Sequence, residues 1–298
     1  MNDNKPRLGY LGVGLMGAPM VERLLEAGYP VTVWNRTKSK TEPLAAKGAS
    51  VADTPAELAA ASDIVLMCLM DATAVETVLF GENGIASVKS ASVTGPKYLV
   101  DFSSIRPDAA RDLAGRLAEA NGMHLIDAPV SGGVPGAKAG TLAIMAGGEA
   151  EDIEAVRPVV MHLAQRFTHM GPSGAGQTTK LVNQIVSGCT MAITAEAVAF
   201  AEHAGVDATR LTEALGGGFA DSKPFQLFAP RMARRDYSNP LGSTNSMLKD
   251  LDTVLAVGAE TGASLPFAST AVEIMRKTAE NGDGESCITT IVKQFDKS

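Results

Sequence analysis

The chain has 298 residues, which is long enough for two domains of ordinary size. Hydrophobic residues make up 45% and charged residues 20%, an ordinary globular composition. The net charge of −7 disfavours nucleic-acid and anionic-membrane partners, while a local cationic pocket can still bind a small anionic substrate. The 3 cysteines lie far apart in the sequence and the 4 histidines show no metal-ligand spacing, so we expect no disulfide framework and no metal.

One stretch near the start of the chain bears on targeting. Leu8 to Val21 carries no charge and loosely resembles the core of a signal peptide. Glycines and a proline interrupt it, and it is too short to cross a bilayer. A strand and a phosphate-binding turn explain these residues better. We therefore expect no signal peptide, no transmembrane helix and a cytoplasmic location, which also suits the cysteine usage.

Apolar runs alternate with helical patterns over the first ~170 residues, which is typical of a parallel α/β sheet. Strands are predicted at Arg7–Leu11, Val31–Trp34, Asp63–Leu69, Leu99–Phe102, His124–Asp127, Leu142–Met145 and Phe167–Met170. Helices are predicted at Met16–Ala27 before Gly28, at Thr37–Lys47 before Gly48, after the Thr54-Pro55 cap, and at Pro107–Asn121.

The pattern changes after Gly171. Gly171 to Gly176 is predicted to be a loop, and Gln177–His203 one long helix of roughly 25 residues. Helical patterns without strand alternation fill the remainder. The predicted fold is an α/β Rossmann N-terminal domain, residues 1–171, joined by a long interdomain helix to an all-α C-terminal domain. That second domain, residues 172–298, is expected to contribute to substrate binding and dimerisation.

The most informative motif is Gly12-Val-Gly14-Leu-Met-Gly17, which follows a strand and opens a helix. This context is the one that a dinucleotide-binding turn requires. The first glycine permits the tight turn, the second lets the backbone approach the pyrophosphate, and the third lets helix and strand pack closely. The helix N-terminus then faces the phosphates. We expect Leu15 and Met16, between the last two glycines, to contribute to the same cofactor site.

The end of the second predicted strand bears on the choice of cofactor. An acidic residue there would bind the ribose 2′-hydroxyl of NAD, but this chain has Asn35-Arg36-Thr37. Arg36 can stack on the adenine and pair with a 2′-phosphate, and Thr37 adds a hydroxyl donor. NADP is therefore the preferred cofactor and NAD remains possible. The competing interpretation is that Arg36 is a solvated residue at a helix start.

Two later segments carry candidate chemistry. Asp127-Ala-Pro-Val-Ser131-Gly132-Gly133 follows a strand end, where small residues can present bare N–H groups to a substrate carboxylate. An ordinary glycine-rich turn would have the same appearance. Lys180, Asn183 and Gln184 stand at i, i+3 and i+4 on one helix face. Such a lysine can place its ammonium beside a bound carbonyl, although an isolated lysine is by default a solvated surface residue.

Taken together, these motifs resemble the β-hydroxyacid dehydrogenase family. The resemblance is carried by the glycine turn with Met16, Pro19 and Met20, by Asp127 to Gly133, by Gly174-Ala-Gly-Gln-Thr-Thr-Lys180-Leu-Val-Asn183, and by Lys249-Asp250-Leu251. The segments occur in the family's order and span nearly the whole chain. The family includes 3-hydroxyisobutyrate dehydrogenase, tartronate semialdehyde (2-hydroxy-3-oxopropionate) reductase and L-threonate dehydrogenase.

The resemblance implies a role for each matching residue. Lys180 would be the catalytic acid/base, and Ser131, Gly132 and Gly133 would hold the substrate carboxylate. Leu69, Met70 and Ser104 would border the nicotinamide. Lys249 would reach both substrate and cofactor from the helical domain, positioned by Asp250. The family also implies a homodimer or homotetramer formed through the helical domain.

Family members differ after the lysine, and the Asn183-Gln184 pair resembles the pair found in tartronate semialdehyde reductases. Imine-reducing relatives usually lack the lysine, so the presence of Lys180 argues against that branch. The expected activity is hydride transfer between NADP(H) or NAD(H) and a short β-hydroxy acid or its semialdehyde or keto form. Asn183 and Gln184 would orient substrate oxygens, and desolvation with nearby Lys249 would lower the pKa of Lys180.

Three alternative substrates are 3-hydroxyisobutyrate, threonate and 3-phenylserine. A non-catalytic NADP-binding sensor is the alternative from another functional class. Phe219, Ser222 and Phe225 are candidates for lining the substrate pocket. We expect the partner to be a small carboxylate-bearing molecule, with no nucleic acid and no membrane.

Overall fold

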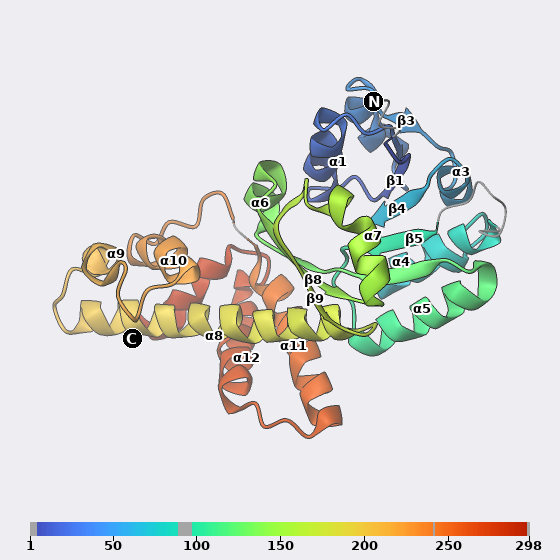
Figure 1. Ribbon diagram of the computed structural model, residues 1–298. Coiled ribbons are helices and arrows are strands. Elements are labelled where there is room, and N and C mark those ends of the chain that lie inside the picture. The colour runs from blue at the N-terminus through green and yellow to red at the C-terminus, as the bar shows by residue number, and fades with distance from the viewer. Residues whose placement is uncertain (1–4, 89–96, 241, 297–298) are drawn as a thin grey trace. The chain divides into compact units, whose positions relative to one another are not determined.

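The computed structural model describes residues 5–88, 97–240 and 242–296 (Figure 1). The chain divides into two compact units, Met1–Lys180 and Leu181–Ser298. The first is a Rossmann-type α/β unit, and the described part of the second is helical except for one isolated bridge between Ser243 and Cys287. The predicted fold class is thereby confirmed.

Parallel strands form the centre of the first unit. The described strands are β1 (Leu8–Leu11), β2 (Val31–Trp34), β3 (Ser50–Val51), β4 (Ile64–Met67), β5 (Tyr98–Asp101), β6 (His124–Asp127), β7 (Val130–Ser131), β8 (Leu142–Gly147) and β9 (Ala164–Gly171). Strands β3, β2, β1, β4, β5 and β6 lie side by side in that order and are all parallel. Strand β8 continues the sheet antiparallel to β6 and pairs with both β7 and β9.

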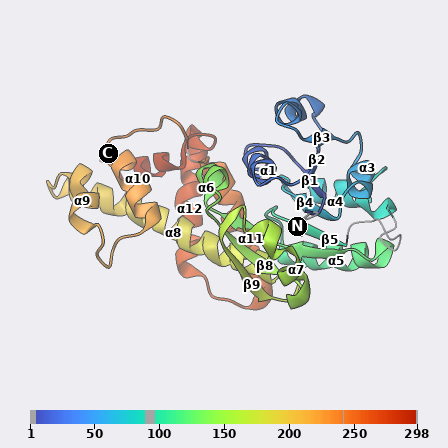
Figure 2. The same ribbon diagram turned by 45° about the horizontal axis from the view of Figure 1, so that its top comes forward.

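Helices cover both faces of this sheet, because successive strand residues point to opposite sides. One face carries α1 (Gly17–Glu26), α2 (Glu42–Ala45), α6 (Gly133–Ala139) and α7 (Ala150–Val160). The other carries α3 (Pro55–Ala60), α4 (Ala72–Phe80) and α5 (Pro107–Asn121) (Figure 1 and Figure 2). In β1, for example, Tyr10 enters the core under α1 while Leu11 enters the core under α3. Both residues are fully buried.

The predicted helix ends are confirmed by their backbone geometry. Gly28 and Gly48 follow their helices with φ of +79° and +101°, values that favour glycine. The Thr54 hydroxyl accepts a hydrogen bond from the N–H of Glu57 and so caps α3. The expected helix over Thr37–Lys47 is shorter than predicted, since a 3₁₀ turn at Lys38–Thr41 precedes α2.

Some elements were not predicted, for identifiable reasons. Strands β3 and β7 have two residues each, too few for alternation to show. Helix α6 contains two glycines and a proline in seven residues, a composition typical of turns. The loop predicted over Gly171 to Gly176 is partly wrong, because α8 (Ala175–His203) already begins at Ala175. The Asp127 carboxylate caps that helix start from a distant part of the sequence.

The second unit packs helices around the C-terminal part of α8. The described helices are α9 (Leu211–Leu215), α10 (Lys223–Ala233), α11 (Thr244–Thr261) and α12 (Pro266–Thr278), with shorter helical segments at Ala208–Arg210, Ala279–Asp283 and Ile288–Phe295. Helices α11 and α12 lie side by side (Figure 1 and Figure 2). Gly188 of α8 meets Leu251 of α11, where even a methyl group would crowd the leucine side chain. The glycine therefore permits these two helices to approach closely.

Helix α8 is also notable for its length of 29 residues. Among the described helices it alone is long and apolar enough to cross a membrane, and half of its most apolar window is buried within the protein. Met191, Ala195 and Val198 of this helix belong to the core of the second unit. That core packing accounts for the buried half of its apolar window.

Candidate active site

The carboxyl ends of the parallel strands form one edge of the sheet. Leu11 at the end of β1 is in register with Trp34 of β2 and with Met67 of β4. Met67 is in turn aligned with Asp101 of β5, and Asp101 with Asp127 of β6. The chain runs from β1 to β2 on one side and later adds β4 on the other, so the strand order reverses at β1. Ligands of open α/β sheets bind at such a reversal point.

The glycine turn occupies that point with each glycine in a different role. Gly12 has a φ of +91°, and a Cβ there would overlap the carbonyl oxygen of Cys68. A Cβ at Gly17 would overlap the carbonyl oxygen of Gly12. A Cβ at Gly14 would meet no atom within 4 Å. The fold thus requires glycine at positions 12 and 17. At Gly14 the space beside the backbone is empty, so a ligand can approach it.

The residues after β2 divide into a half-buried and an exposed part. The side-chain Oδ1 of Asn35 accepts from the N–H of Val13 at 3.2 Å, and its side-chain amide donates to the backbone carbonyl of Thr37 at 2.9 Å. Asn35 therefore fastens the glycine turn to the end of β2. Arg36 and Thr37 are exposed, and no carboxylate among the described residues pairs with Arg36. Just before them, the Trp34 indole donates to the Asp53 carbonyl at 3.2 Å.

The ends of β4 and β5 are joined by a serine that was not predicted. The Leu69 N–H donates to the Ser103 hydroxyl at 2.8 Å, and Ser103 is buried. Ser104, the predicted residue, is exposed, and so is Met70, whose side chain is 84% accessible. The available signal was a serine directly after the predicted strand Leu99–Phe102, but the resemblance pointed to the second of the two adjacent serines.

A buried carboxylate lies beneath this edge. Asp101 is fully buried, its Oδ1 accepts from the Ser103 N–H at 2.9 Å, and its Oδ2 has no hydrogen-bond partner in the described part of the chain. Burial raises the pKa of Asp101 to about 6. Burial, reinforced by the charge of Asp101, raises the pKa of the Cys68 thiol to about 12. Both groups thus favour their neutral forms more than usual.

We expect the stability contribution of Asp101 to depend on pH. Its pKa rises on folding from 3.8 to about 6, so the folded state holds this proton more tightly. The resulting stabilisation is present below about pH 4 and is lost as pH rises through about 6. Two pKa units correspond to about 3 kcal/mol. Urea unfolding from pH 4 to 7 should show Asp101→Asn gaining stability relative to the wild type as pH rises.

The matched control for this measurement is Glu119→Gln, which neutralises an exposed carboxylate on α5. Its stability curve should run parallel to that of the wild type. An Asp101→Asn curve that also ran parallel would contradict the assignment.

The predicted carboxylate-binding turn follows β6. Ser131 ends the two-residue strand β7, and Gly132 and Gly133 have φ of +130° and +58° at the start of α6. Both glycines are exposed. Consecutive positive φ values are unfavourable for other residue types, which explains the pair of glycines. The turn presents its backbone at the surface near the end of β6.

Lys180 lies beside this turn. Its Nζ donates to the carbonyl oxygen of Val130 at 2.9 Å, one residue before Ser131. Asp127, which is fully buried, accepts from the N–H groups of Gly174 and Gln177 at 2.7 and 2.8 Å. Asp127 at the end of β6 thus holds the start of the lysine's helix, and Lys180 of that helix contacts β7, which leads into the turn. Burial raises the pKa of Asp127, while these backbone donors lower it.

Two of the predicted site residues in the second unit, Asn183 and Gln184, are hydrogen-bonded to each other. The Asn183 amide donates to the Gln184 Oε1 at 2.7 Å, and the Gln184 amide donates to Asp250 at 2.5 Å. Gln184 is buried, Asn183 is half-buried, and Lys249 on α11 is exposed. Asp250 therefore contacts Gln184, a connection that the sequence did not predict. Within this unit, Gln184 links the helix α8 to α11.

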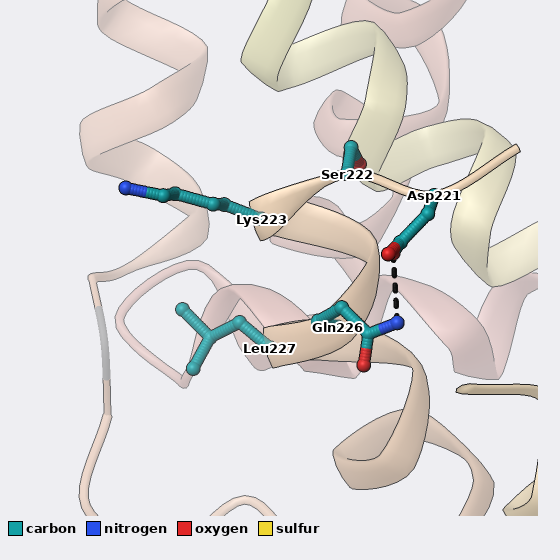
Figure 3. A pocket seen from close by; sticks show the side chains of 5 residues that line it. All are labelled: Asp221, Ser222, Lys223, Gln226 and Leu227. Carbon is teal, nitrogen blue, oxygen red and sulfur yellow. Dashed lines mark hydrogen bonds between the residues drawn. The ribbon is translucent and has the colours of Figure 1, made fainter. Parts of the chain in front are cut away.

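The second unit also has a hollow at the start of α10, lined by Asp221, Ser222, Lys223, Gln226 and Leu227. Figure 3 shows Gln226 turned toward Asp221, to which it donates at 2.7 Å, while Lys223 and Leu227 extend away. Ser222 caps α10, Phe219 is fully exposed, and Phe225 is buried in the core. Phe225 packs inside this unit and is not among the residues that line this hollow, so its expected place in the substrate pocket stays a prediction.

The chain matches two known domain families over nearly its whole length. Residues 7–171 match the NAD-binding domain of 6-phosphogluconate dehydrogenase. Residues 174–295 match the NAD-binding domain of NADP-dependent 3-hydroxyisobutyrate dehydrogenase.

Individual relatives agree with these families. A probable 3-hydroxyisobutyrate dehydrogenase-like protein of Arabidopsis thaliana, named as mitochondrial, is 36% identical over 98% of this chain and 88% of its own. The 2-hydroxy-3-oxopropionate reductase of Escherichia coli is 37% identical over 97% of each chain. The structure of Mycobacterium tuberculosis 3-hydroxyisobutyrate dehydrogenase with L-serine is 30% identical, covers 98% of this chain and all of its own, and has a TM-score of 0.87. The chain belongs to the β-hydroxyacid dehydrogenase family of NAD(P)-dependent oxidoreductases.

Proposed function

We propose that the protein transfers a hydride between NADP(H) and a short β-hydroxy acid or its semialdehyde or keto form, with tartronate semialdehyde as the first candidate. One observation carries the proposal. The ammonium of Lys180 lies 2.9 Å from the carbonyl of Val130, at the beginning of the turn Ser131 to Gly133. A cationic acid/base beside a turn suited to a carboxylate matches what a hydroxy acid requires of an enzyme.

The residues of the first unit fit a dinucleotide. Gly14 offers open space for a pyrophosphate beside the N-terminus of α1, where backbone N–H groups favour anions. Leu15 and Met70 are apolar side chains with 85% and 84% of their surface accessible, which a bound cofactor would cover. Leu69 and Ser104 would border its nicotinamide. When bound, the nicotinamide supplies or accepts the hydride.

Lys180 would exchange the proton. For oxidation of a hydroxy acid, its neutral amine accepts the proton of the substrate hydroxyl as the C–H bond breaks. For reduction, its ammonium donates a proton to the forming hydroxyl oxygen. Ser131 and the N–H groups of Gly132 and Gly133 hold the carboxylate. Gln184, whose amide is engaged by Asn183 and Asp250, orients Asn183 toward a substrate oxygen, and Lys249 supplies a further cation for substrate and cofactor.

The NADP preference rests on the end of β2. Arg36 is exposed, is not neutralised by any described carboxylate, and is followed by the exposed hydroxyl of Thr37. A guanidinium there matches the geometry of a 2′-phosphate. Asn35 contributes indirectly, by holding the glycine turn against β2.

A substrate and cofactor panel tests the proposed function. Initial rates would be measured with NADP and NAD on glycerate, 3-hydroxyisobutyrate, serine, threonate and 3-phenylserine, and on tartronate semialdehyde with both reduced cofactors. We expect the highest kcat/KM for the tartronate semialdehyde and glycerate pair with NADP(H). A higher value for another acid would replace the substrate assignment. Tight NADPH binding without turnover of any compound would favour a cofactor-binding sensor.

We also propose that the protein is a homodimer or homotetramer. Four apolar side chains on α8 are between 54% and 74% accessible and lie on one helix face: Val182, Val186, Ile193 and Phe200. We call them the α8 stripe. Their spacings of four, seven and seven residues are those of a helix seam. An exposed row of this kind is suited to burial against a second copy of the chain.

Ile193→Glu should dissociate the assembly, because it places a charge in the middle of the α8 stripe. Burying an unpaired charge costs several kcal/mol, enough to favour the monomer at micromolar concentration. Size-exclusion chromatography with light scattering measures the mass directly. Ala120→Glu, which adds the same charge on the exposed surface of α5, is the control and should leave the mass unchanged. A wild-type protein that is already monomeric would overturn the proposal.

A further inference from the structure

A buried glutamine connects three segments of the first unit. Gln177 is 1% accessible and lies in the first turn of α8. Its amide donates to the Ser103 carbonyl at 2.8 Å, and its Oε1 accepts from the Ile105 N–H at 3.1 Å. Its own N–H donates to Asp127 at 2.8 Å. Both polar ends of this side chain are therefore satisfied by the backbone that follows β5.

The partners of Gln177 are parts of the proposed site. Ser103, whose carbonyl Gln177 binds, also accepts the Leu69 N–H through its hydroxyl. This links the segment proposed to border the nicotinamide to α8. Lys180 lies three residues after Gln177 in the same helix. The Gln177 side chain thus connects the segment proposed to border the nicotinamide to α8, the helix that carries Lys180.

We propose that Gln177 is a positioning residue that sets the distance between the nicotinamide-bordering segment and Lys180. The inference rests on the proposed function, and it adds Gln177 to the residues of the proposed site. The two hydrogen bonds hold α8 in one register along residues 103–105, since a shift of the helix would break both. A misplacement of about 1 Å in such a site costs on the order of 10²-fold in rate.

Two variants of similar size separate this role from simple packing. In Gln177→Glu, the ionised carboxylate still accepts from Ile105 but faces the Ser103 carbonyl with an oxygen. When protonated, the same group donates to Ser103 and accepts from Ile105, as the glutamine does. Burial favours the protonated form. Gln177→Leu lacks both polar atoms at every pH.

The experiment measures the reduction reaction from pH 5.5 to 9 for the wild type, both variants and Gln165→Glu, an exposed control on β9. Rates would be compared with ordinary cofactor and with cofactor deuterated at the transferred hydrogen. At pH 9 we expect Gln177→Glu to lose on the order of 10²-fold in kcat, with a larger isotope effect. Its kcat relative to the wild type should recover as pH falls, while that of Gln177→Leu should stay low throughout.

Two results would overturn the proposal. One is a kcat of Gln177→Glu that stays at the same fraction of the wild-type kcat at every pH. The other is a folded Gln177→Leu with the wild-type kcat and isotope effect, a test that holds even if the glutamate variant fails to fold at high pH. The proposed function fails separately, if Lys180→Ala is as active as the wild type. An inactive Lys180→Ala beside a normal Gln177→Leu would reject the positioning role alone.

Discussion

Lys180→Ala should lower kcat by about 10²–10⁴-fold, the usual contribution of a positioned acid or base. The substitution removes an amine that contacts the carbonyl of Val130, just before the Ser131 to Gly133 turn, while the glycine turn at β1 stays intact. Cofactor affinity, measured by calorimetry, should therefore change little. Lys180→Arg should be similarly impaired, because a guanidinium does not release its proton near neutral pH.

Lys277→Ala is the matched control, since it removes an exposed lysine from α12. Its kcat should equal that of the wild type. Near-normal turnover of Lys180→Ala would reject the assignment of the acid/base. A parallel loss of cofactor binding would show that the substitution damaged the fold.

Arg36→Asp should reverse the cofactor preference. The substitution removes the cation proposed to pair with the 2′-phosphate and adds a carboxylate that repels it. A carboxylate at this position binds the ribose 2′-hydroxyl of NAD. We expect kcat/KM for NADP to fall by about tenfold or more, the effect of about 1.4 kcal/mol, and that for NAD to be maintained or to rise.

Arg234→Asp makes the same charge change at an exposed arginine of the second unit and should alter neither value. Raising the salt concentration should weaken NADP binding in the wild type more than in Arg36→Asp, because exposed charge pairs are screened. Equal losses for both cofactors in Arg36→Asp would instead identify Arg36 as a stacking residue without phosphate selectivity.

The sequence was sufficient for features whose physical cause is local. The turn at Gly12, Gly14 and Gly17 could be predicted because a strand and a helix flank it. Gly28 and Gly48 mark helix ends because glycine, which lacks a Cβ, adopts a positive φ readily. The long helix α8 was recognisable from an unbroken run without prolines and with few glycines.

Features that depend on distant contacts could not be predicted in the same way. Nothing near Gln177 indicates that its amide binds the Ser103 carbonyl 74 residues earlier. The early start of α8 depends on Asp127, 47 residues before its partner Gly174. Gln184 was expected to face the substrate, yet its amide is held by Asp250 on another helix. Each of these side chains is polar and buried, so its partner is set by the fold.

The indole of Trp34, at the end of β2, gives the protein an intrinsic optical probe. It is the single tryptophan of the chain, and it immediately precedes Asn35-Arg36-Thr37. All tryptophan emission therefore originates from the strand end proposed to hold the adenosine half of the cofactor. Reduced nicotinamide absorbs in the range where tryptophan emits, so energy transfer can report its arrival without a label. Oxidised cofactor lacks that absorption, and the same signal can follow the redox state of the bound dinucleotide through a turnover.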